Sequence, residues 1–396
     1  MSRIKYEPKS VRELLTKMKD VSDTMIDLAY AALQFQDKEI AEQVRKLEAK
    51  MDELMYEIRI LATMSVRSTD DAEKMTGVLQ IANAAETISN ATEEMVDLVL
   101  RDIEIHPVIQ TALMETEERT DVVEVGGGSS LDGKILSNLR LPSRIGVWIL
   151  ALKRRGSWLV PPAKNTRIRG KDLLVAKGPE EGIEILHEMA GVPWKPRSLG
   201  RRLRKLRDAL ARMRDLSSSM VDMAYSAVLF RSREVAEEVR ELEGVFDGLN
   251  YELSLAVLRA AKREKDVGKL NSVLQFVKYM EKISNSADLI ADVILHGVEL
   301  HPVFARALEE AEEQIGKVRV SKRSPLAGHT LGKLNLEVRT GVDVFTVKRG
   351  KKYIFNPADR VTILPGDYLI VRGPELGIEN LKKIAAGRGK LPPLEE

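Results

Sequence analysis

Hydrophobic side chains in the first third of the chain recur at helical spacing. Between about residues 11 and 117 they fall at positions i, i+3, i+4 and i+7, which places them on one face of an α-helix. Serine, threonine and aspartate at about 35–38 and 68–70 are typical helix caps, so the pattern predicts three long helices, the third over 71–105. A short fourth helix is predicted to open at Pro107. Long amphipathic helices with brief connections are typical of an antiparallel bundle.

From about residue 121 the pattern changes to short apolar runs separated by glycine and proline. These runs predict strands over 122–125, 146–152, 157–160 and 172–176, and helices near 131–139 and 180–189. An α/β unit of about 70 residues with an open sheet edge is marginal alone. We therefore expect it to pair with another copy of itself, within the chain or in a second chain.

The whole pattern occurs twice. A segment that starts at Met25, MIDLAYAALQF, overlies MVDMAYSAVLF from Met220 without a gap, and the same offset of 195 residues holds along the chain. Glycines and prolines outside the helices also match at this offset, which shared helical composition cannot explain. The matched pairs include His106-Pro107 with His301-Pro302, Gly133 with Gly328, Gly146 with Gly341, Pro162 with Pro357, and Gly178-Pro179 with Gly373-Pro374.

The sequence thus predicts an α+β multidomain protein with a pseudo-two-fold internal repeat. Antiparallel helical bundles are each followed by a small α/β domain. The predicted helical domains span 1–118 and 201–313, the α/β domains span 119–191 and 314–390, and a linker spans 192–200.

Composition narrows the class of protein. The 396 residues are 44% hydrophobic and 31% charged, but the net charge is only +2, so no global field indicates a nucleic-acid partner. The absence of cysteine excludes disulfides, thiolate metal sites and cysteine nucleophiles. Neither an apolar leader nor an uninterrupted apolar run of about 18 residues occurs, so we expect a cytoplasmic protein.

The α/β segment of the second copy closely resembles the TrkA-C domain, also called the RCK C-terminal domain, which is a regulatory domain of potassium-transport subunits. The residues that carry the resemblance are Ser324, Leu326, Gly328, Leu331, Leu334, Gly341-Val342, Lys348-Arg349-Gly350, Asn356-Pro357, Pro365-Gly366-Asp367 and Gly373. The first copy keeps the front of this pattern but departs at Pro161, Asn165 and Lys171. A ligand site implied by the resemblance is therefore expected in the second copy.

That site is predicted near Arg339, Asn356, Pro357 and Arg360. A loop with a proline-fixed backbone, an amide that both donates and accepts, and nearby guanidinium groups suits an anionic, nucleotide-like ligand such as cyclic di-AMP. In the alternative, Asn356-Pro357 only starts a turn.

The helical segments are similar to PhoU, a three-helix phosphate-signalling family whose E-x-x-x-D pairs can hold metal. Glu48 with Asp52, and Glu243 with Asp247, match that spacing. Asn90 and Asn285 stand where the third helix of the family carries a second aspartate. Oxygen ligands suit a hard divalent cation such as Mg²⁺ or Mn²⁺. A solvated helix face is the favoured alternative.

Two further segments resemble known binding motifs. The segment from Gly128 to Lys134 follows most of the P-loop pattern, but Ile135 stands where a Mg²⁺-binding hydroxyl is required, so hydrolysis of a nucleotide is not expected. The first helix of the second copy is basic, which suits an anionic membrane leaflet, an acidic partner or, in the favoured interpretation, a solvated face. Its cations are Arg201, Arg202, Arg204, Lys205, Arg207, Arg212 and Arg214.

The sequence therefore predicts a regulator rather than an enzyme, because no nucleophile–base pair or complete cofactor motif occurs. The leading hypothesis is a cytosolic regulator of potassium or other cation transport. In it the α/β domains pair and bind a small molecule or ion, and the protein acts on a membrane transporter or channel. The alternative is a metal-binding or phosphate-transport adaptor that acts through the bundles.

Overall fold

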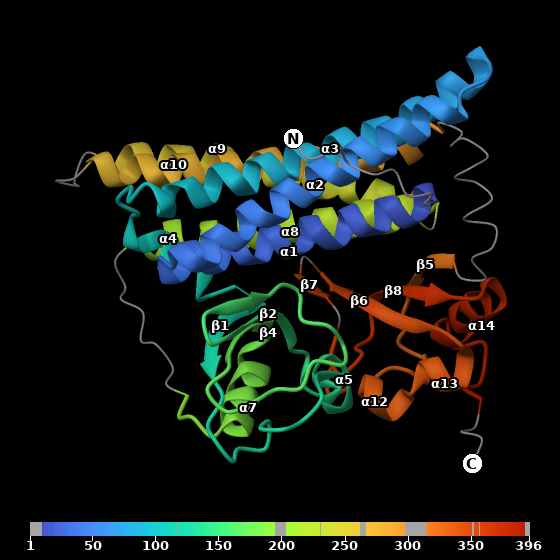
Figure 1. The fold of residues 1–396 in the computed structure, drawn as a ribbon. Helices are drawn as coiled ribbons and strands as arrows, with labels where there is room; N and C mark the ends of the chain where they lie inside the picture. Colours follow the sequence, from blue (N-terminus) through green and yellow to red (C-terminus); the bar gives the residue numbers. More distant parts are fainter. Residues whose placement is uncertain are drawn as a thin grey trace.

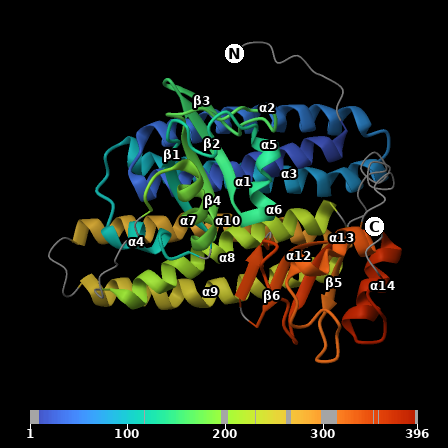
Figure 2. The ribbon, with the colours of Figure 1, turned by 90° about the horizontal axis from the view of Figure 1, so that it is seen from below.

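The computed structural model describes residues 10–116, 118–194, 203–229, 231–261, 267–297, 314–350, 352–355 and 357–392. Its long helices form one layer, and two small α/β domains lie side by side against one face of that layer (Figure 1). Figure 2, seen from the side of the sheets, shows the helices running behind both domains. The fold is thus α+β with two repeats, as the sequence predicts.

The two helical domains pack directly against each other. Helix α3 contacts α10, and α1 and α4 contact α8, so the interface between the copies runs along the helix axes. One continuous apolar core spans both domains. The helices of the first copy are α1 (Val11–Phe35), α2 (Lys38–Ser65), α3 (Thr69–Leu100) and α4 (Pro107–Leu113). Those described in the second are α8 (Arg204–Leu229), α9 (Arg233–Ala261) and α10 (Val267–Leu295).

Local capping explains where the helices of the first copy begin. The side chain of Asp37 accepts hydrogen bonds from the amides of Glu39 and Ile40 at the start of α2. Ser68 caps α3 in the same way. Helix α3 ends at Leu100, before the predicted 105, and the chain then turns through Asp102, whose φ is +54°. His106 begins α4 by accepting from the amide of Val108 through Nδ1.

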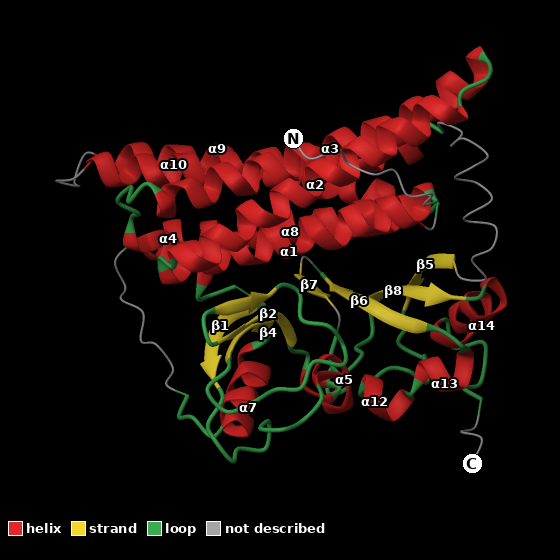
Figure 3. Cartoon of the chain, in the orientation of Figure 1, coloured by secondary structure: helices red, strands yellow, loops and turns green. Residues whose placement is uncertain are grey.

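Each α/β domain is a four-stranded antiparallel sheet with short helices and one longer helix (Figure 3). The strand orders β1-β4-β2-β3 and β5-β8-β6-β7 are identical between the copies. The first domain contains β1 (Arg119–Glu124), α5 (Leu136–Leu139), α6 (Leu141–Ile145), β2 (Trp148–Arg154), β3 (Ser157–Leu159), β4 (Leu173–Gly178) and α7 (Glu180–Ala190). The second contains β5 (Gln314–Arg319), α12 (Leu331–Leu334), α13 (Leu336–Thr340), β6 (Asp343–Arg349), β7 (Lys352–Phe355), β8 (Tyr368–Gly373) and α14 (Glu375–Ala385).

Two predicted elements of the first α/β domain are wrong in extent. The single helix expected over 131–139 is a turn followed by the short helices α5 and α6. The strand expected from 146 begins at Trp148, because Gly146 caps α6 in the left-handed conformation with φ +68°. A glycine adopts that conformation without steric penalty.

The same buried ion pair braces both sheets. Arg154 donates from Nε to Asp172 Oδ1 at 2.8 Å and from a second nitrogen to Asp172 Oδ2 at 2.6 Å. At the equivalent positions, Arg349 donates to both oxygens of Asp367 at 2.9 and 2.8 Å. Asp367 belongs to the Pro-Gly-Asp motif of the TrkA-C resemblance, so this motif residue has a structural role.

Candidate functional site

The interface between the helical domains contains two reciprocal hydrogen bonds. The hydroxyl of Tyr30 lies 3.1 Å from that of Ser217, and the hydroxyl of Ser22 lies 3.4 Å from that of Tyr225. The two tyrosines are equivalent in the repeat, and so are the two serines. Contacts of i with j′ and of j with i′ are the signature of two-fold pairing. The copies therefore associate as two halves of a pseudosymmetric dimer within one chain.

Charged residues beside these hydroxyls follow the same reciprocity. Lys19 Nζ lies 2.8 Å from Asp222 Oδ1, and the equivalent pair, Arg214 with Asp27, is separated by 3.6 Å. Asp23, one turn along α1 from Lys19, also binds the Lys19 ammonium. Each helical domain thus presents a cation and a carboxylate to the other.

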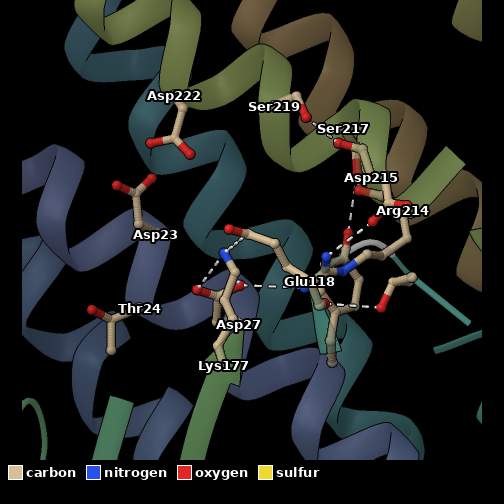
Figure 4. Close-up of polar contacts among 12 residues, drawn as sticks. Asp23, Thr24, Asp27, Glu118, Lys177, Arg214, Asp215, Ser217, Ser219 and Asp222 are labelled. Carbon is tan, nitrogen blue, oxygen red and sulfur yellow. Dashed lines mark hydrogen bonds and ion pairs between the residues drawn. The ribbon is translucent and has the colours of Figure 1, made fainter. Parts of the chain in front are cut away.

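The first α/β domain joins this cluster through Lys177, near the end of β4. Its Nζ lies 3.1 Å from the Asp27 carboxylate and 2.9 Å from that of Glu118, and Figure 4 shows it between the two. Asp27 therefore binds a cation from the α/β domain and a cation from the second helical domain. We call this cluster the ionic junction: Lys19, Asp23, Asp27, Glu118, Lys177, Arg214, Asp215 and Asp222.

Burial is deepest around Asp27 and Arg214, whose side chains are 8% and 3% exposed. Burial alone would lower the pKa of Lys177, but the carboxylates of Asp27 and Glu118 raise it well above its ordinary value. The pKa of Lys19 is raised in the same way, chiefly by the charge of Asp222. Both lysines are therefore fully charged at neutral pH.

The two carboxylates around Lys19 titrate differently. Burial raises the pKa of Asp23 to about 7, and the nearby charge of Asp222 acts in the same direction against the attraction of Lys19. Burial would raise the pKa of Asp222 too, but Lys19 and Lys177 outweigh it and the pKa is lowered. Asp222 thus stays ionised, and Asp23 exchanges its proton near neutral pH.

Interlocked buried charges favour discrete arrangements, because a partly separated pair leaves an uncompensated charge out of water. A shift of β4 along α1 would move Lys177 away from Asp27 and disturb the pairing of Asp27 with Arg214. The junction is therefore suited to couple the position of an α/β domain to the packing of the two helical domains.

The sequence prediction missed this site. Lys19, Asp23 and Asp27 follow one another at four-residue spacing beside the apolar stripe of α1, and a cation and a carboxylate recur in the second copy at Arg214 and Asp222. Charged residues beside the apolar stripe in both copies could have indicated a buried ionic site.

The favoured interpretation of the basic helix as a solvated face is wrong for two of its arginines. Arg214 is 2% exposed and belongs to the junction. Arg207 is also buried, and its Nε lies 2.5 Å from Glu115. Both arginines lie where α8 packs against the first copy, so they serve the interface between the copies.

The residues predicted to bind an anionic ligand lie on two segments of the second α/β domain. Arg339, on α13, donates to the carbonyls of Pro392 and Leu334. Arg360, in the loop before β8, lies 3.5 Å from Glu181 of the first α/β domain. Pro357 is half-buried in the same loop, and Asn356 lies outside the described residues. No hydrogen bond or ion pair joins Arg339, Pro357 and Arg360, the three that the structure describes, and the ligand site stays a prediction.

The two α/β domains touch at this loop. Gly146 approaches Ala358 so closely that a Cβ on the glycine would lie 3.3 Å from the Ala358 Cβ. Arg360 therefore stands at the boundary between the domains, where a ligand could contact both.

The predicted metal carboxylates lie on α2 and α9. Glu48 and Glu243 are half-buried, while Asp52 and Asp247 are exposed. Burial and the nearby charges of Asp52, Glu93 and Glu86 raise the pKa of Glu48. The pKa of Glu243 is likewise raised by burial and by Asp247. Among the described residues, no group of three or more histidine, aspartate or glutamate side chains could hold a metal ion. Metal binding by these pairs stays a prediction.

The glycine-rich loop of the first α/β domain is closed by its own side chain. Asp132 accepts hydrogen bonds from the amides of Gly128 and Gly170 at 2.9 and 3.0 Å, and these bonds lower its pKa. A P-loop presents such amides to a phosphate. Here the loop's own carboxylate already accepts from the amide of Gly128, and it ties the loop to Gly170.

Comparison with known families bears on the two kinds of domain. The family model for the PhoU domain matches residues 15–99 and 210–294, and that for the TrkA-C domain matches 122–191 and 315–386. The chain is a tandem repeat of PhoU and TrkA-C domains. Both are regulatory domain families, which indicates a regulatory role in phosphate or cation transport.

Individual relatives are distant. A curated "Uncharacterized transporter sll0640" of Synechocystis is 28% identical over 106 residues, which are 26% of this chain and 17% of that protein. The crystal structure of PhoU from Pseudomonas aeruginosa is 11% identical, with a TM-score of 0.43 over 75% of this chain and 96% of that one. PhoU from Streptococcus pneumoniae is also 11% identical, with a TM-score of 0.42 over 72% and 93%. In the described part of the PhoU and TrkA-C repeat, no helix is long and apolar enough to cross a membrane.

Proposed function

We propose that this protein is a non-catalytic, cytosolic regulator of potassium or other cation transport that senses a small ligand through its TrkA-C domains. The observation that carries the proposal is the position of Asp27, which binds Lys177 of a TrkA-C domain and Arg214 of the opposite PhoU domain. Through this carboxylate, a displacement of the first TrkA-C domain reaches the interface between the PhoU domains. A transporter or channel at the membrane would then respond to that interface.

The ligand is proposed to bind the second TrkA-C domain near Arg339 and Arg360, at its boundary with the first. An anion that draws Arg360 away from Glu181 would change how the two TrkA-C domains meet, and the first domain carries Lys177. Only a difference in affinity between two arrangements can drive such a change. A coupling of about 1–3 kcal/mol is typical of allosteric proteins.

A thermal-shift screen of the full chain against cyclic di-AMP, ATP, K⁺, Mg²⁺, Mn²⁺ and phosphate tests for the ligand, since a ligand that binds only the native state raises the melting temperature. Transmission can then be followed through tryptophan emission, because Trp158 donates to Glu39 on α2 and so reports how the first TrkA-C domain is seated. The variant Trp158→Phe shows how much of the tryptophan emission comes from Trp158.

We expect Lys177→Met to retain ligand affinity but lose the emission change, with the exposed Lys164→Met as the matched control. An unaltered emission change in Lys177→Met would exclude the junction as the route. Absence of any nucleotide or cation binding would leave only the adaptor alternative.

That alternative is a metal-binding or phosphate-transport adaptor. Carboxylates gathered beside Glu48 and Glu243 favour it, because their mutual repulsion is relieved by a cation. Elemental analysis of the purified protein tests it. Stoichiometric Mn, Fe or Zn that is lost in Glu48→Gln/Asp52→Asn would support the adaptor.

A further inference from the structure

A groove of about 300 Å³ lies on the seam between the two PhoU domains, outside the ionic junction. It is formed by α3 and α10, which Figure 1 draws on the side of the helical layer away from the sheets. One wall is Leu289 of α10, whose side chain is 47% exposed. The lining from α3 comprises Thr76, Leu79, Gln80, Asn83, Ala84 and Thr87.

The internal repeat shows what is missing from this groove. Tyr279 stands at the position equivalent to Ala84, Lys282 at that of Thr87, and Glu94 at that of Leu289. There, Lys282 Nζ binds both oxygens of Glu94 at 2.6 and 2.8 Å and lies 6.0 Å from the centre of the Tyr279 ring. The half-buried tyrosine and the ion pair thus occupy the place that is hollow at the other end of the seam.

We propose that the groove receives the tyrosyl side chain of a partner protein. The chain's own repeat places a phenol ring at the equivalent point, so the local backbone geometry suits one. A cavity of about 150 Å³ is large enough for benzene, so the available volume is sufficient. Gln80, Asn83 and Thr87 are the polar residues of the lining. Gln80 donates to the carbonyl of Leu289 and Thr87 to that of Asn83, both at 3.0 Å.

A partner's side chain fits better than a free aromatic compound. Sites for small molecules bury about 70–90% of the ligand, whereas this groove is open along one side and would leave a free ring exposed. A partner surface would cover the ring from outside. Tyrosines that are buried and surrounded by contacts that exclude water are typical anchors of protein interfaces. The exposed apolar side chain of Leu289 would be covered by the same partner. The inference does not depend on which ligand the TrkA-C domains bind, and its test needs no transporter.

The test uses N-acetyl-L-tyrosinamide as the probe, with N-acetyl-L-leucinamide as the reference compound, in saturation-transfer NMR on the full chain. We expect transfer to the tyrosyl ring in the wild type with a Kd of roughly 1 mM, as for a single side chain without its partner surface. Ala84→Tyr supplies the ring internally and should reduce transfer at least tenfold. The matched control is Thr63→Tyr, which adds a tyrosine at an exposed position of α2 and should leave transfer unchanged.

A second variant keeps the test decisive if Ala84→Tyr misfolds. Tyr279→Ala should open an equivalent groove at the other end of the seam and raise the number of probe sites from one to two. Unchanged transfer in Ala84→Tyr, or none in the wild type, would overturn the proposal. A micromolar Kd for free p-cresol would assign the groove to a small aromatic compound instead. Self-association that is lost in Tyr251→Ala, a variant of the most exposed tyrosine described, would assign it to a second copy of this chain.

Discussion

Lys177 and Asp27 belong to different domains, and their charged groups meet at 3.1 Å where both side chains are largely removed from water. The lysine comes from a strand of the TrkA-C domain and the aspartate from the first helix of the PhoU domain. Since the aspartate also binds Arg214, three domains depend on one carboxylate. This arrangement makes the junction accessible to mutational tests.

Replacing Lys177 with methionine is expected to destabilise the protein by about 3 kcal/mol, because Asp27 and Glu118 lose the cation that compensates their burial. The urea midpoint measured at pH 7.5 should fall accordingly, whereas exposed Lys164→Met should leave it within error. In the double variant Glu118→Gln/Lys177→Met we expect part of the loss to be recovered, since Asp27 keeps its pair with Arg214 and the side chain at 118 no longer carries an uncompensated charge. A double variant weaker than Lys177→Met would contradict this account.

Stability is expected to depend on pH through Asp23. Its pKa of about 7 in the folded chain lies above the ordinary value of 3.8, so between these values the folded chain holds a proton that the unfolded chain has released. The stabilisation is complete below about pH 4 and is lost as the pH rises through 7. The groups facing Asp23 are Lys19, Asp222 and Asp27, and the lowered pKa of Asp222 keeps that carboxylate ionised across this window.

Asp23→Asn should therefore flatten the fall in melting temperature between pH 5 and pH 8, because asparagine stays neutral throughout. Exposed Glu53→Gln is the control, and histidine titration contributes equally to all three proteins. The same slope in Asp23→Asn as in the wild type would show that Asp23 does not titrate in this range.

The reciprocal hydroxyl contacts predict two similar effects from sites 195 residues apart. Tyr30→Phe and Tyr225→Phe should each cost about 1 kcal/mol, since each leaves a buried serine without its tyrosyl partner. The effect of Tyr30→Phe should be larger than that of Tyr225→Phe, because the hydroxyl contact of Tyr30 is shorter. Phenylalanine at position 30 retains the edge-to-face contact with Phe276, so the variant tests the hydroxyl alone. Urea unfolding of both single variants and of the double variant measures this. Strong non-additivity would mean that the two contacts are not independent.

Removal of Arg360 should weaken binding of an anionic ligand without weakening the fold. Its pair with Glu181 is 3.5 Å long and exposed on both sides, so it contributes little to stability. A charge-assisted contact to a ligand is worth about 1.5–3 kcal/mol, so Arg360→Ala and Arg339→Ala should each raise the Kd about ten- to a hundredfold by calorimetry. The control is Arg388→Ala, which removes an exposed arginine of the same domain outside the proposed site. An affinity unchanged in both Arg339→Ala and Arg360→Ala would remove this site.

Patterns that repeat within a short stretch of chain were predictable. The long helices have apolar positions every three or four residues and polar caps, and the repeat is visible in glycines and prolines that must match in register. The sequence predicted one longer helix where α5 lies and did not predict α6, because helices of four and five residues are too short to show a helical period. Gly146 was placed in a strand although its role is to end a helix.

The ionic junction could not be derived from one copy of the pattern. Asp27 and Lys177 are 150 positions apart, and whether either is buried depends on how the two copies and the first TrkA-C domain come together. A charged residue next to an apolar stripe has the same local sequence whether it faces water or another domain.

The fusion of the two halves also determines what kind of interface they can share. Two separate subunits held by tyrosine–serine contacts and buried ion pairs would have to overcome both the desolvation of those groups and the entropy of association, and they would separate on dilution. Joined in one chain, each half meets the other at an effective concentration that the linker sets and that dilution does not change. The tyrosine–serine contacts and the ion pairs between the halves can therefore persist at any concentration of the protein.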